Sequence, residues 1–330
     1  MLNNLNILFF FMMILSTLLS VSSTNWLGTW MGLEVNMMSF IPMILVNKNI
    51  LSNEASLKYF LIQAIASCSF ITFCLMNSIY TNFFSSMQMT MLVNLLVILP
   101  LMMKMGAAPF QAWFIVTMEG LNWMKCFILM TWQKVAPMFI LMYISLPKII
   151  IPFSILSLMA GALGGLNQTS LKKIMAYSSV NHLGWMMTGM MMNKFMLIFY
   201  FSAYIMLNYF TLTNLMKLNK MNFNQIFSKP DFYLAVSLLS LSGLPPFLGF
   251  LPKWMIINWT INNNMYMLSV IMIITALITI FFYMRMILNS IIMSNYTQKW
   301  VLSNYSTYSF MNNIMLMLTM TGMLLFNFMI

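Results

Sequence analysis

Long apolar runs, each near the length of a membrane-crossing helix, follow one another along almost all of this 330-residue chain. A helix of about 20 residues crosses the hydrocarbon core of a bilayer, and only helices and closed barrels satisfy their backbone hydrogen bonds there. A barrel would show short segments of alternating polarity, whereas these runs are long. Because 62% of the residues are hydrophobic and 6% are charged, the sequence predicts an all-α, polytopic membrane protein.

The lengths of the apolar runs predict about eleven transmembrane helices. They cover residues 5–21, 26–46, 58–77, 91–122, 126–144, 149–166, 174–192, 195–216, 232–262, 265–288 and 310–330. The connections between them are short, polar and rich in Asn and Ser, so no stretch remains for a soluble domain. Residues 1–330 are therefore predicted to form a single transmembrane domain.

The loop cations gather on one side of the membrane when these crossings alternate. Lys and Arg concentrate in loops on the side where a membrane protein is made. One side receives Lys48, Lys58, Lys125, Lys172, Lys173, Lys217, Lys220, Lys229, Arg285 and Lys299, and the other receives Lys148 and Lys194. The asymmetry predicts an N-terminus on the matrix or cytoplasmic side and a C-terminus opposite. It also explains the net charge of +11 without a nucleic-acid partner.

The start of the chain and its composition bear on where it is made. No Lys or Arg precedes the first apolar run, so the start resembles neither a secretory signal nor a mitochondrial transit peptide. Met, Ile, Phe, Asn and Tyr are abundant while Arg occurs once, as in an AT-rich genome whose code reads extra codons as Met. If the protein is organellar, we expect it to be encoded and made inside the organelle.

Residues that hold redox cofactors are scarce. Cys68, Cys74 and Cys126 form no CxxC pair, and His182 is the single histidine, which excludes a haem held by two histidines of this chain. No GxGxxG motif follows a strand pattern. We therefore expect neither a redox cofactor nor a metal in this chain.

Four ionisable residues, Glu34, Lys104, Lys134 and Lys253, lie inside apolar runs. Such residues are rare at membrane depth because burying a charge is costly, and they mark functional sites. Lys134 is near the middle of its run, roughly 12–15 Å from either end of the helix, beyond the reach of a snorkelling side chain. It must face the interior of the helix bundle or water.

The acidic residues are too few to neutralise these lysines. Glu54, Glu119 and Asp231 fall in or near loops, which leaves Glu34 as the one carboxylate well within a crossing. The lysines must then lie in hydrated cavities or exchange their protons readily. Either situation favours a proton relay over a fixed structural ion pair.

Lys104 and Lys253 each adjoin a predicted break in a helix. Gly106 and Pro109 follow Lys104, while the run 243–249 (GLPPFLG) and Pro252 precede Lys253. Gly and Pro interrupt helices, and the exposed backbone is tolerated at membrane depth where it lines a cavity. Two interrupted helices in corresponding halves predict an inverted repeat with a pathway between the halves. Two proline kinks used for packing are the alternative.

Two weaker signals lie between these breaks. His182, about two turns into its helix, is a candidate to pass protons between Lys134 and Lys253, and a hydrogen-bonded core histidine is an equal alternative. Gly161, Gly164 and Gly165 lie within an apolar crossing with no Lys-Ser/Thr after them. Close helix packing is the better interpretation of these glycines than a nucleotide loop.

Four stretches give a specific resemblance that extends over essentially the whole chain. They are LMMKMGAAPF at 101–110, TWQKVAP at 131–137, LKKIMAYSS at 171–179 and GLPPFLGFLPKW at 243–254. These stretches resemble the subunit 2 family of mitochondrial NADH:ubiquinone oxidoreductase (respiratory complex I), a family of antiporter-like membrane subunits.

The resemblance implies roles for the buried ionisable residues. Glu34 would pair with Lys104, Lys134 would be the central relay on an unbroken helix, and Lys253 would pass protons toward the intermembrane space. Many relatives carry a histidine after the Ala-Pro-Phe motif, where this chain has Gln111. An amide can order water but does not titrate, so a relay role at that position is not expected here.

The resemblance also implies a setting. The chain would be a proton-translocating subunit of the mitochondrial inner membrane, coupled to electron transfer from NADH to ubiquinone. FMN, iron–sulfur clusters and ubiquinone would belong to other subunits. The partners would be other membrane-arm subunits, including neighbouring antiporter-like and small membrane subunits, and phospholipids. A stand-alone cation/proton antiporter and a purely structural membrane spacer are the alternatives.

Overall fold

The structure is a computed structural model, which describes residues 4–45, 49–83, 87–144, 146–217, 221–222, 225, 232–296, 313, 316–317 and 319–320. The chain divides into two compact units, Met1–Phe153 and Ser154–Ile330. Helices account for the regular structure of these residues, apart from one isolated bridge between Ser170 and Asn222. The prediction of a helical fold is thus confirmed for the described part of the chain.

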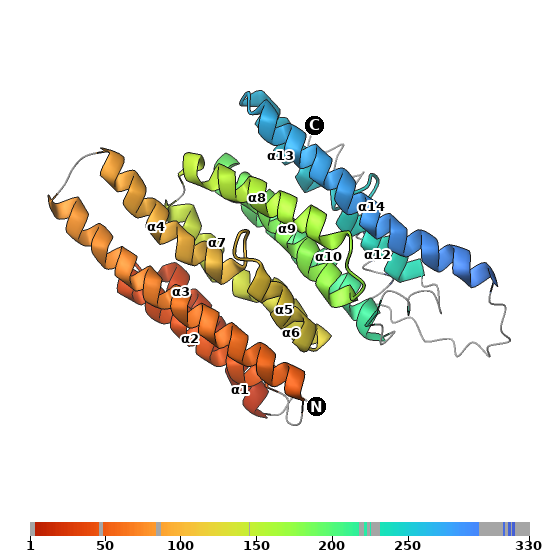
Figure 1. Ribbon diagram of the computed structural model, residues 1–330, viewed down its shortest axis with the longest axis horizontal. Coiled ribbons are helices and arrows are strands. Elements are labelled where there is room, and N and C mark those ends of the chain that lie inside the picture. The colour runs from red at the N-terminus through yellow and green to blue at the C-terminus, as the bar shows by residue number, and fades with distance from the viewer. Residues whose placement is uncertain are drawn as a thin grey trace. The chain divides into compact units, whose positions relative to one another are not determined.

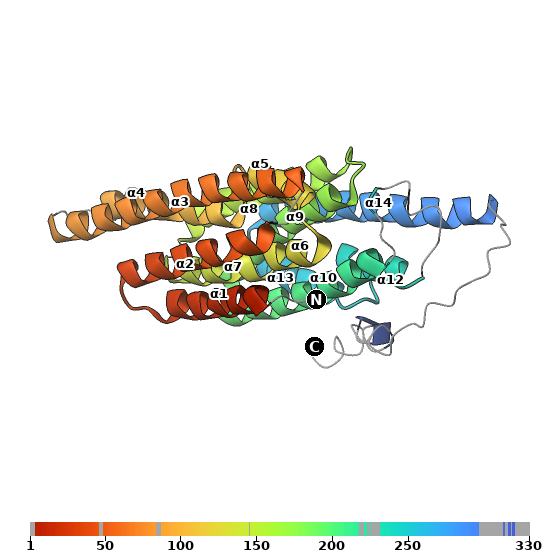
Figure 2. The same ribbon diagram turned by 90° about the horizontal axis from the view of Figure 1, so that it is seen from below.

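Among the described residues, seven helices lie wholly within the first unit. They are α1 (Asn4–Ser22), α2 (Trp26–Ile44), α3 (Ile50–Phe83), α4 (Met87–Met105), α5 (Ala112–Gly120), α6 (Trp123–Met130) and α7 (Trp132–Ile144). Figure 1 shows α3 along α4, and α3 also contacts α5. Figure 2 shows α1 and α2 side by side, and these two helices pack extensively on each other. Helix α7 packs against α1, α2 and α4, so it lies at the centre of this unit.

The second unit is built around α9 and α10. Its helices are α9 (Leu171–Met192), α10 (Lys194–Lys217), α12 (Phe232–Ser242), α13 (Phe250–Asn262) and α14 (Tyr266–Tyr296), and the boundary between units falls inside α8 (Pro147–Gly165). Helix α9 packs on α10 and α13, while α14 packs on α12 and α13. Most side chains of α9 are buried, which makes it the core helix of the unit.

Six of the described helical segments are long and apolar enough to cross a membrane. They are Leu5–Ser22, Ile50–Ile79, Trp123–Ile144, Pro147–Gly165, Lys194–Lys217 and Tyr266–Leu288. Helices α2 and α9 are long enough but less apolar, because they carry polar residues that the bundle buries. The predicted crossing 310–330 lies mostly outside the described residues.

Helix α3 begins earlier than the predicted crossing at 58–77. The Asn49 side chain accepts a hydrogen bond from the Leu51 N–H at 3.2 Å, which caps the helix at its start. The hydroxyls of Ser52 and Ser56 donate to carbonyls three residues earlier, at 2.8 and 2.7 Å. Local hydrogen bonds thus extend the helix through a polar segment that hydropathy alone assigned to a loop.

The glycines of α8 permit close helix packing, as the sequence indicated. A Cβ added at Gly161 would lie 2.5 Å from the backbone nitrogen of Asn181 on α9, and one at Gly165 would lie 3.1 Å from the Phe282 ring on α14. At Gly164 it would collide with the Tyr177 ring. Small residues let helix backbones approach closely in this way.

Gly161→Ala should therefore destabilise the second unit by roughly 1–3 kcal/mol, because the backbone atoms of α9 cannot yield as a flexible side chain would. Gly189→Ala is the matched control, since its Cβ would meet Ile256 at an ordinary 3.4 Å. Thermal unfolding in detergent, followed for both variants, measures the difference. Equal stability of the two variants would contradict the packing argument.

Candidate functional site

The first helix break separates α4 from α5. Gly106 adopts φ +70°, a conformation that favours glycine, and the N–H of Ala107 bonds the Met102 carbonyl at 3.1 Å. The indole N–H of Trp113 donates to the Met103 carbonyl at 3.0 Å, and the Gln63 amide donates to the Lys104 carbonyl at 3.2 Å. Side-chain donors thus satisfy carbonyls that the ended helix leaves open, as burial requires.

The second break separates α12 from α13 and uses a lysine for the same purpose. Gly243 adopts φ +80°. The ammonium of Lys253, from the first turn of α13, donates to the Ser242 carbonyl at 2.8 Å. The carbonyl end of a helix carries partial negative charge, so a cation is favourable there. A Cβ at Gly243 would lie 3.0 Å from Lys253 Nζ, which shows how closely the ammonium approaches the turn.

Lys104 lines a small polar cavity in the first unit. Its side chain is 6% exposed, and the polar cavity walls also include Asn36, Tyr59, Gln63 and Gln133. The cavity offers about 10 Å³ to the centre of a water molecule, close to the minimum that one buried water needs. With several polar groups facing it, this cavity is suited to a single hydrogen-bonded water beside the ammonium.

Glu34 on α2 is half-buried, and among the described residues the structure records no direct ion pair between it and Lys104. The direct ion pair that it does record, Lys58–Glu54 at 3.6 Å, is exposed on α3.

A chain of amide and hydroxyl groups continues from the Lys104 cavity to the residue next to Lys134. The Tyr59 hydroxyl donates to Gln133 Oε1 at 3.2 Å, and Gln133 Nε2 donates to Asn36 Oδ1 at 3.2 Å. Gln133 also approaches Met13 Sδ at 3.3 Å. One glutamine thereby connects α1, α2, α3 and α7, and it fixes the start of the helix that carries Lys134.

Lys134 is almost fully buried, at 1% exposed, and lies three residues after a local irregularity in its helix. Thr131 separates α6 from α7 by one residue, although Trp123–Ile144 together form one segment long enough to cross a membrane. The Thr131 hydroxyl donates to the Phe127 carbonyl at 2.6 Å, and the Lys134 N–H bonds the Thr131 carbonyl three residues back at 3.1 Å. The hydroxyl competes for a carbonyl of the helical ladder, which tightens the chain just before Lys134.

An aromatic ring faces the ammonium of Lys134. Its Nζ lies 4.9 Å from the centroid of the Phe114 ring on α5, the short helix after the first break. A cation over a ring face is attracted by about 2 kcal/mol where water is excluded. This contact stabilises a buried charge without supplying an acceptor strong enough to hold its proton.

Lys253 and His182 share the interior of the second unit. Lys253 is 7% exposed and its Nζ lies 5.7 Å from the Trp185 ring. Trp185 is one turn beyond His182 on α9, and His182 Nδ1 is 2.8 Å from the Tyr200 hydroxyl on α10. His182 is therefore a hydrogen-bonded core residue one helical turn from the aromatic contact of Lys253, so its geometry fits both alternatives.

The residues predicted to relay protons thus fall into two groups, one in each unit. Glu34, Lys104 and Lys134 belong to the first unit, while His182 and Lys253 belong to the second. Sequence reasoning missed the amide network of Asn36, Gln63 and Gln133, although amides inside apolar crossings were a visible signal. The aromatic partners Phe114 and Trp185 gave no such signal, because phenylalanine and tryptophan are common throughout the chain.

Gln133 should matter more for stability than Gln111 does. Gln133→Met would leave Asn36 and Tyr59 buried without a partner they now use, at a cost of roughly 1–3 kcal/mol. Gln111 Oε1 is buried with no partner among the described residues, so Gln111→Met should change little. Thermal unfolding in detergent compares them, and a larger loss at Gln111 would contradict the role given to Gln133.

Comparison with known proteins identifies the family to which the chain belongs. Residues 23–279 match the family described as NADH:quinone oxidoreductase/Mrp antiporter, TM. The NADH-ubiquinone oxidoreductase chain 2 of Anopheles gambiae is 44% identical over 308 residues, covering 91% of this chain and 89% of that protein. The Aedes aegypti protein of the same name is 44% identical over 325 residues, covering 96% and 93%. The chain belongs to the NADH-ubiquinone oxidoreductase chain 2 family.

Solved structures share the fold at lower identity. A chain of respiratory complex I from Thermus thermophilus with bound Aureothin has a TM-score of 0.78 at 23% identity, covering 87% of this chain and 71% of that one. A chain of the archaeal membrane-bound sulfane sulfur reductase (MBS) has a TM-score of 0.84 at 16% identity, covering 97% and 73%. The antiporter-like membrane fold is therefore shared across complexes with different names.

Proposed function

We propose that this chain is a proton-translocating membrane subunit of NADH:ubiquinone oxidoreductase and relays protons through buried lysines. Family membership supports the assignment to this enzyme. The observation that carries the relay is the burial of three lysines, Lys104, Lys134 and Lys253, among the helices of the two units. Carbonyl, aromatic and amide neighbours tolerate both the charged and the neutral forms of these side chains.

The relay depends on the electrostatic field at each buried lysine, which changes when a neighbouring charge moves. In the first unit, a shift of Glu34 relative to Lys104 alters the field around the Lys104 cavity and, through the Gln133 network, the field at Lys134. A proton leaving Lys134 then passes toward Lys253, with His182 as a secondary carrier. Lys253 releases its proton on the opposite side, and the Ser242 carbonyl holds the ammonium until then.

The proposed architecture is a single antiporter-like domain of about eleven transmembrane helices with an inverted repeat. The six apolar segments, α2, α9, the interrupted pairs α4–α5 and α12–α13, and residues 310–330 make up that number. Two Gly-centred breaks, each beside a buried lysine, support the two discontinuous helices. The N-terminus lies in the matrix and the C-terminus in the intermembrane space, and the gene is mitochondrial.

The enzyme's remaining parts belong to its partners. FMN, iron–sulfur clusters and the ubiquinone site reside in other subunits, and this chain contacts neighbouring antiporter-like subunits, small membrane subunits and phospholipids. Among the described residues no group of three metal-ligating side chains occurs. The chain's own part is to hold and move protons.

A native gel of detergent-solubilised inner membrane tests the assignment. The large band stained for NADH dehydrogenase activity should contain this chain when its components are identified by mass spectrometry. Migration of the chain alone, together with sodium or potassium exchange after reconstitution, would instead support a stand-alone cation/proton antiporter.

A further inference from the structure

Three tyrosines lie around His182 in the interior of the second unit. The Tyr200 hydroxyl is 2.8 Å from His182 Nδ1, and the ring centroids of Tyr204 and His182 are 5.1 Å apart. Tyr283, on α14, lies within electrostatic range of both tyrosines of α10. Each of the three is at most 2% exposed. We call Tyr200, Tyr204 and Tyr283 the tyrosine cluster, and the relay proposed for the lysines uses none of its hydroxyls.

Serine hydroxyls of α9 border the tyrosine cluster. Ser178 lies within interaction range of Tyr283, and Ser179 lies within that of Tyr204. Both serines donate to carbonyls three residues earlier, at 2.8 and 2.7 Å, and a hydroxyl that donates one hydrogen bond still accepts another. Phenylalanine would fill the tyrosine positions without burying a polar group. The cluster is therefore better suited to passing protons than to packing alone.

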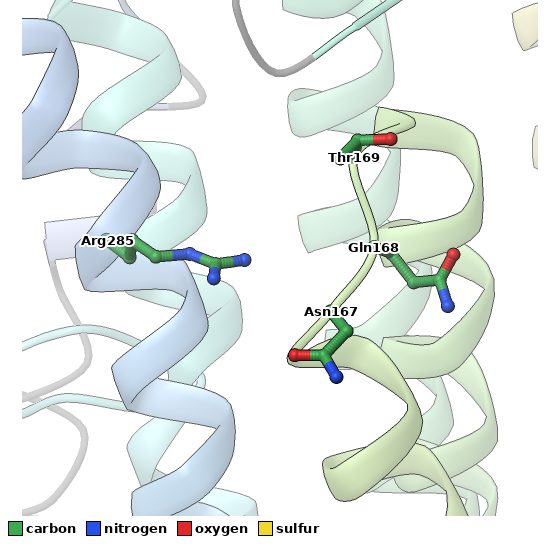
Figure 3. A pocket seen from close by; sticks show the side chains of 4 residues that line it. All are labelled: Asn167, Gln168, Thr169 and Arg285. Carbon is green, nitrogen blue, oxygen red and sulfur yellow. The ribbon is translucent and has the colours of Figure 1, made fainter.

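An open pocket lies where the same helices meet the loop between α8 and α9. Arg285 on α14 forms one wall, and Asn167, Gln168 and Thr169 of the loop form the other (Figure 3). The pocket measures about 400 Å³, and Asn167 and Thr169 are exposed, so water can enter it. Tyr283 is two residues before Arg285 on α14, a rise of about 3 Å along the helix. The pocket therefore lies close to the Tyr283 end of the tyrosine cluster.

We propose that the tyrosine cluster conducts protons from this pocket to His182. The proposal rests on the proposed function, in which His182 is a secondary carrier, and it gives that carrier a proton supply of its own. The groups follow in the order water in the pocket, Tyr283 with Ser178, Tyr204 with Ser179, and Tyr200. Single waters hydrogen-bonded to the hydroxyls span the longer gaps. With the N-terminus in the matrix, the pocket opens on the matrix side.

Each transfer in this route conserves protons. A hydroxyl accepts a proton from its outer neighbour on one lone pair and gives its own proton to its inner neighbour, so no tyrosinate forms. In the last transfer the O–H bond of Tyr200 breaks, a bond forms between the proton and the Nδ1 lone pair of neutral His182, and the imidazole becomes a cation. The cation later gives one proton to the lysine relay and becomes neutral again. One proton thereby leaves the water of the pocket for each proton that His182 passes on.

Substitutions of tyrosine by phenylalanine test the route, because they remove one oxygen and leave the ring in place. Tyr283→Phe should slow NADH-driven proton pumping per assembled complex by roughly threefold or more, since a positioned proton-transfer group contributes more than that in simple reactions. Tyr209→Phe, on α10 with an exposed side chain, is the matched control and should pump as the native complex does.

Pumping in deuterated water supplies a second measurement. The ratio of the pumping rates in H2O and D2O should rise for Tyr283→Phe, because proton delivery then limits the rate. A purely structural loss would leave this ratio unchanged. Slower pumping with a raised ratio in Tyr283→Phe, together with native behaviour of Tyr209→Phe, supports the route.

Three outcomes would overturn the route: native pumping by Tyr283→Phe, slower pumping with an unchanged isotope ratio, or equal slowing by Tyr209→Phe. If Tyr283→Phe does not assemble, Tyr204→Phe decides by the same two measurements. Lys134→Ala separates this proposal from the proposed function. Loss of pumping in Lys134→Ala with native pumping in Tyr283→Phe overturns only the tyrosine route, whereas native pumping in both variants overturns the lysine relay as well.

Discussion

Replacing Lys134 with alanine should abolish most proton pumping while the enzyme still assembles. Lys134 is almost fully buried and its ammonium lies 4.9 Å from the centroid of the Phe114 ring, so its replacement removes an ionisable group from the interior of the first unit. Removing a proton-transferring group costs two to four orders of magnitude in simple reactions, and we expect a loss of about tenfold or more here. NADH-driven acidification in vesicles containing the purified complex measures it.

Two further variants make the Lys134 result interpretable. Lys134→Met preserves the volume of the side chain, which separates loss of the ammonium from a cavity that alanine would leave. Lys148→Ala removes an exposed lysine at the start of α8 and should pump normally. Normal proton translocation by the assembled Lys134→Ala complex would rule out the relay.

Replacing Lys253 with methionine should impair both pumping and the helix break beside it. The variant loses the ionisable group and also the donor that satisfies the Ser242 carbonyl at 2.8 Å. An unsatisfied buried carbonyl costs roughly 1–3 kcal/mol, so the amount of assembled complex should fall together with pumping. Blue native gels quantify assembly, and pumping per assembled complex isolates the chemical effect.

A second variant at Lys253 separates its role as a hydrogen-bond donor from its role as a proton carrier. Lys253→Arg keeps a donor for the Ser242 carbonyl but holds its proton permanently. It should restore assembly and leave pumping impaired. Lys194→Met, at the start of α10, should alter neither. Full pumping by Lys253→Arg would show that Lys253 only caps α12 and carries no proton.

The sequence predicted those features that depend on neighbouring residues. Lys104, Lys134 and Lys253 are buried as expected from their apolar runs, and the breaks at Gly106 and Gly243 fall where Gly and Pro cluster. Local chemistry determines these features, because glycine conformation and proline sterics act within a few residues.

Features that depend on individual hydrogen bonds were not predicted. The irregularity at Thr131 depends on which carbonyl accepts the hydrogen bond of its hydroxyl, and threonine usually lies in a membrane helix without ending it. Gln133 obtains its partners from Asn36 and Tyr59, which are 97 and 74 residues away. Hydropathy also placed the start of α3 too late in the sequence, because the first turn, capped by Asn49, is polar. The pairings of Gln133 exist only after the helices pack, whereas the bonds of Thr131 and Asn49 are local and escape a reading of hydropathy.

The polar content of α2 and α9 has a consequence for how the protein enters the membrane. Neither helix is among the six segments apolar enough to cross by composition, so partition into lipid gives each of them little driving force. Helix α2 follows α1 after a turn of three residues and packs on it extensively. The two should therefore insert as one hairpin, with α1 as the anchor. In the same way α9 depends on α8 and α10 for its insertion. The helices that carry Glu34 and His182 therefore enter the bilayer only together with the helices next to them.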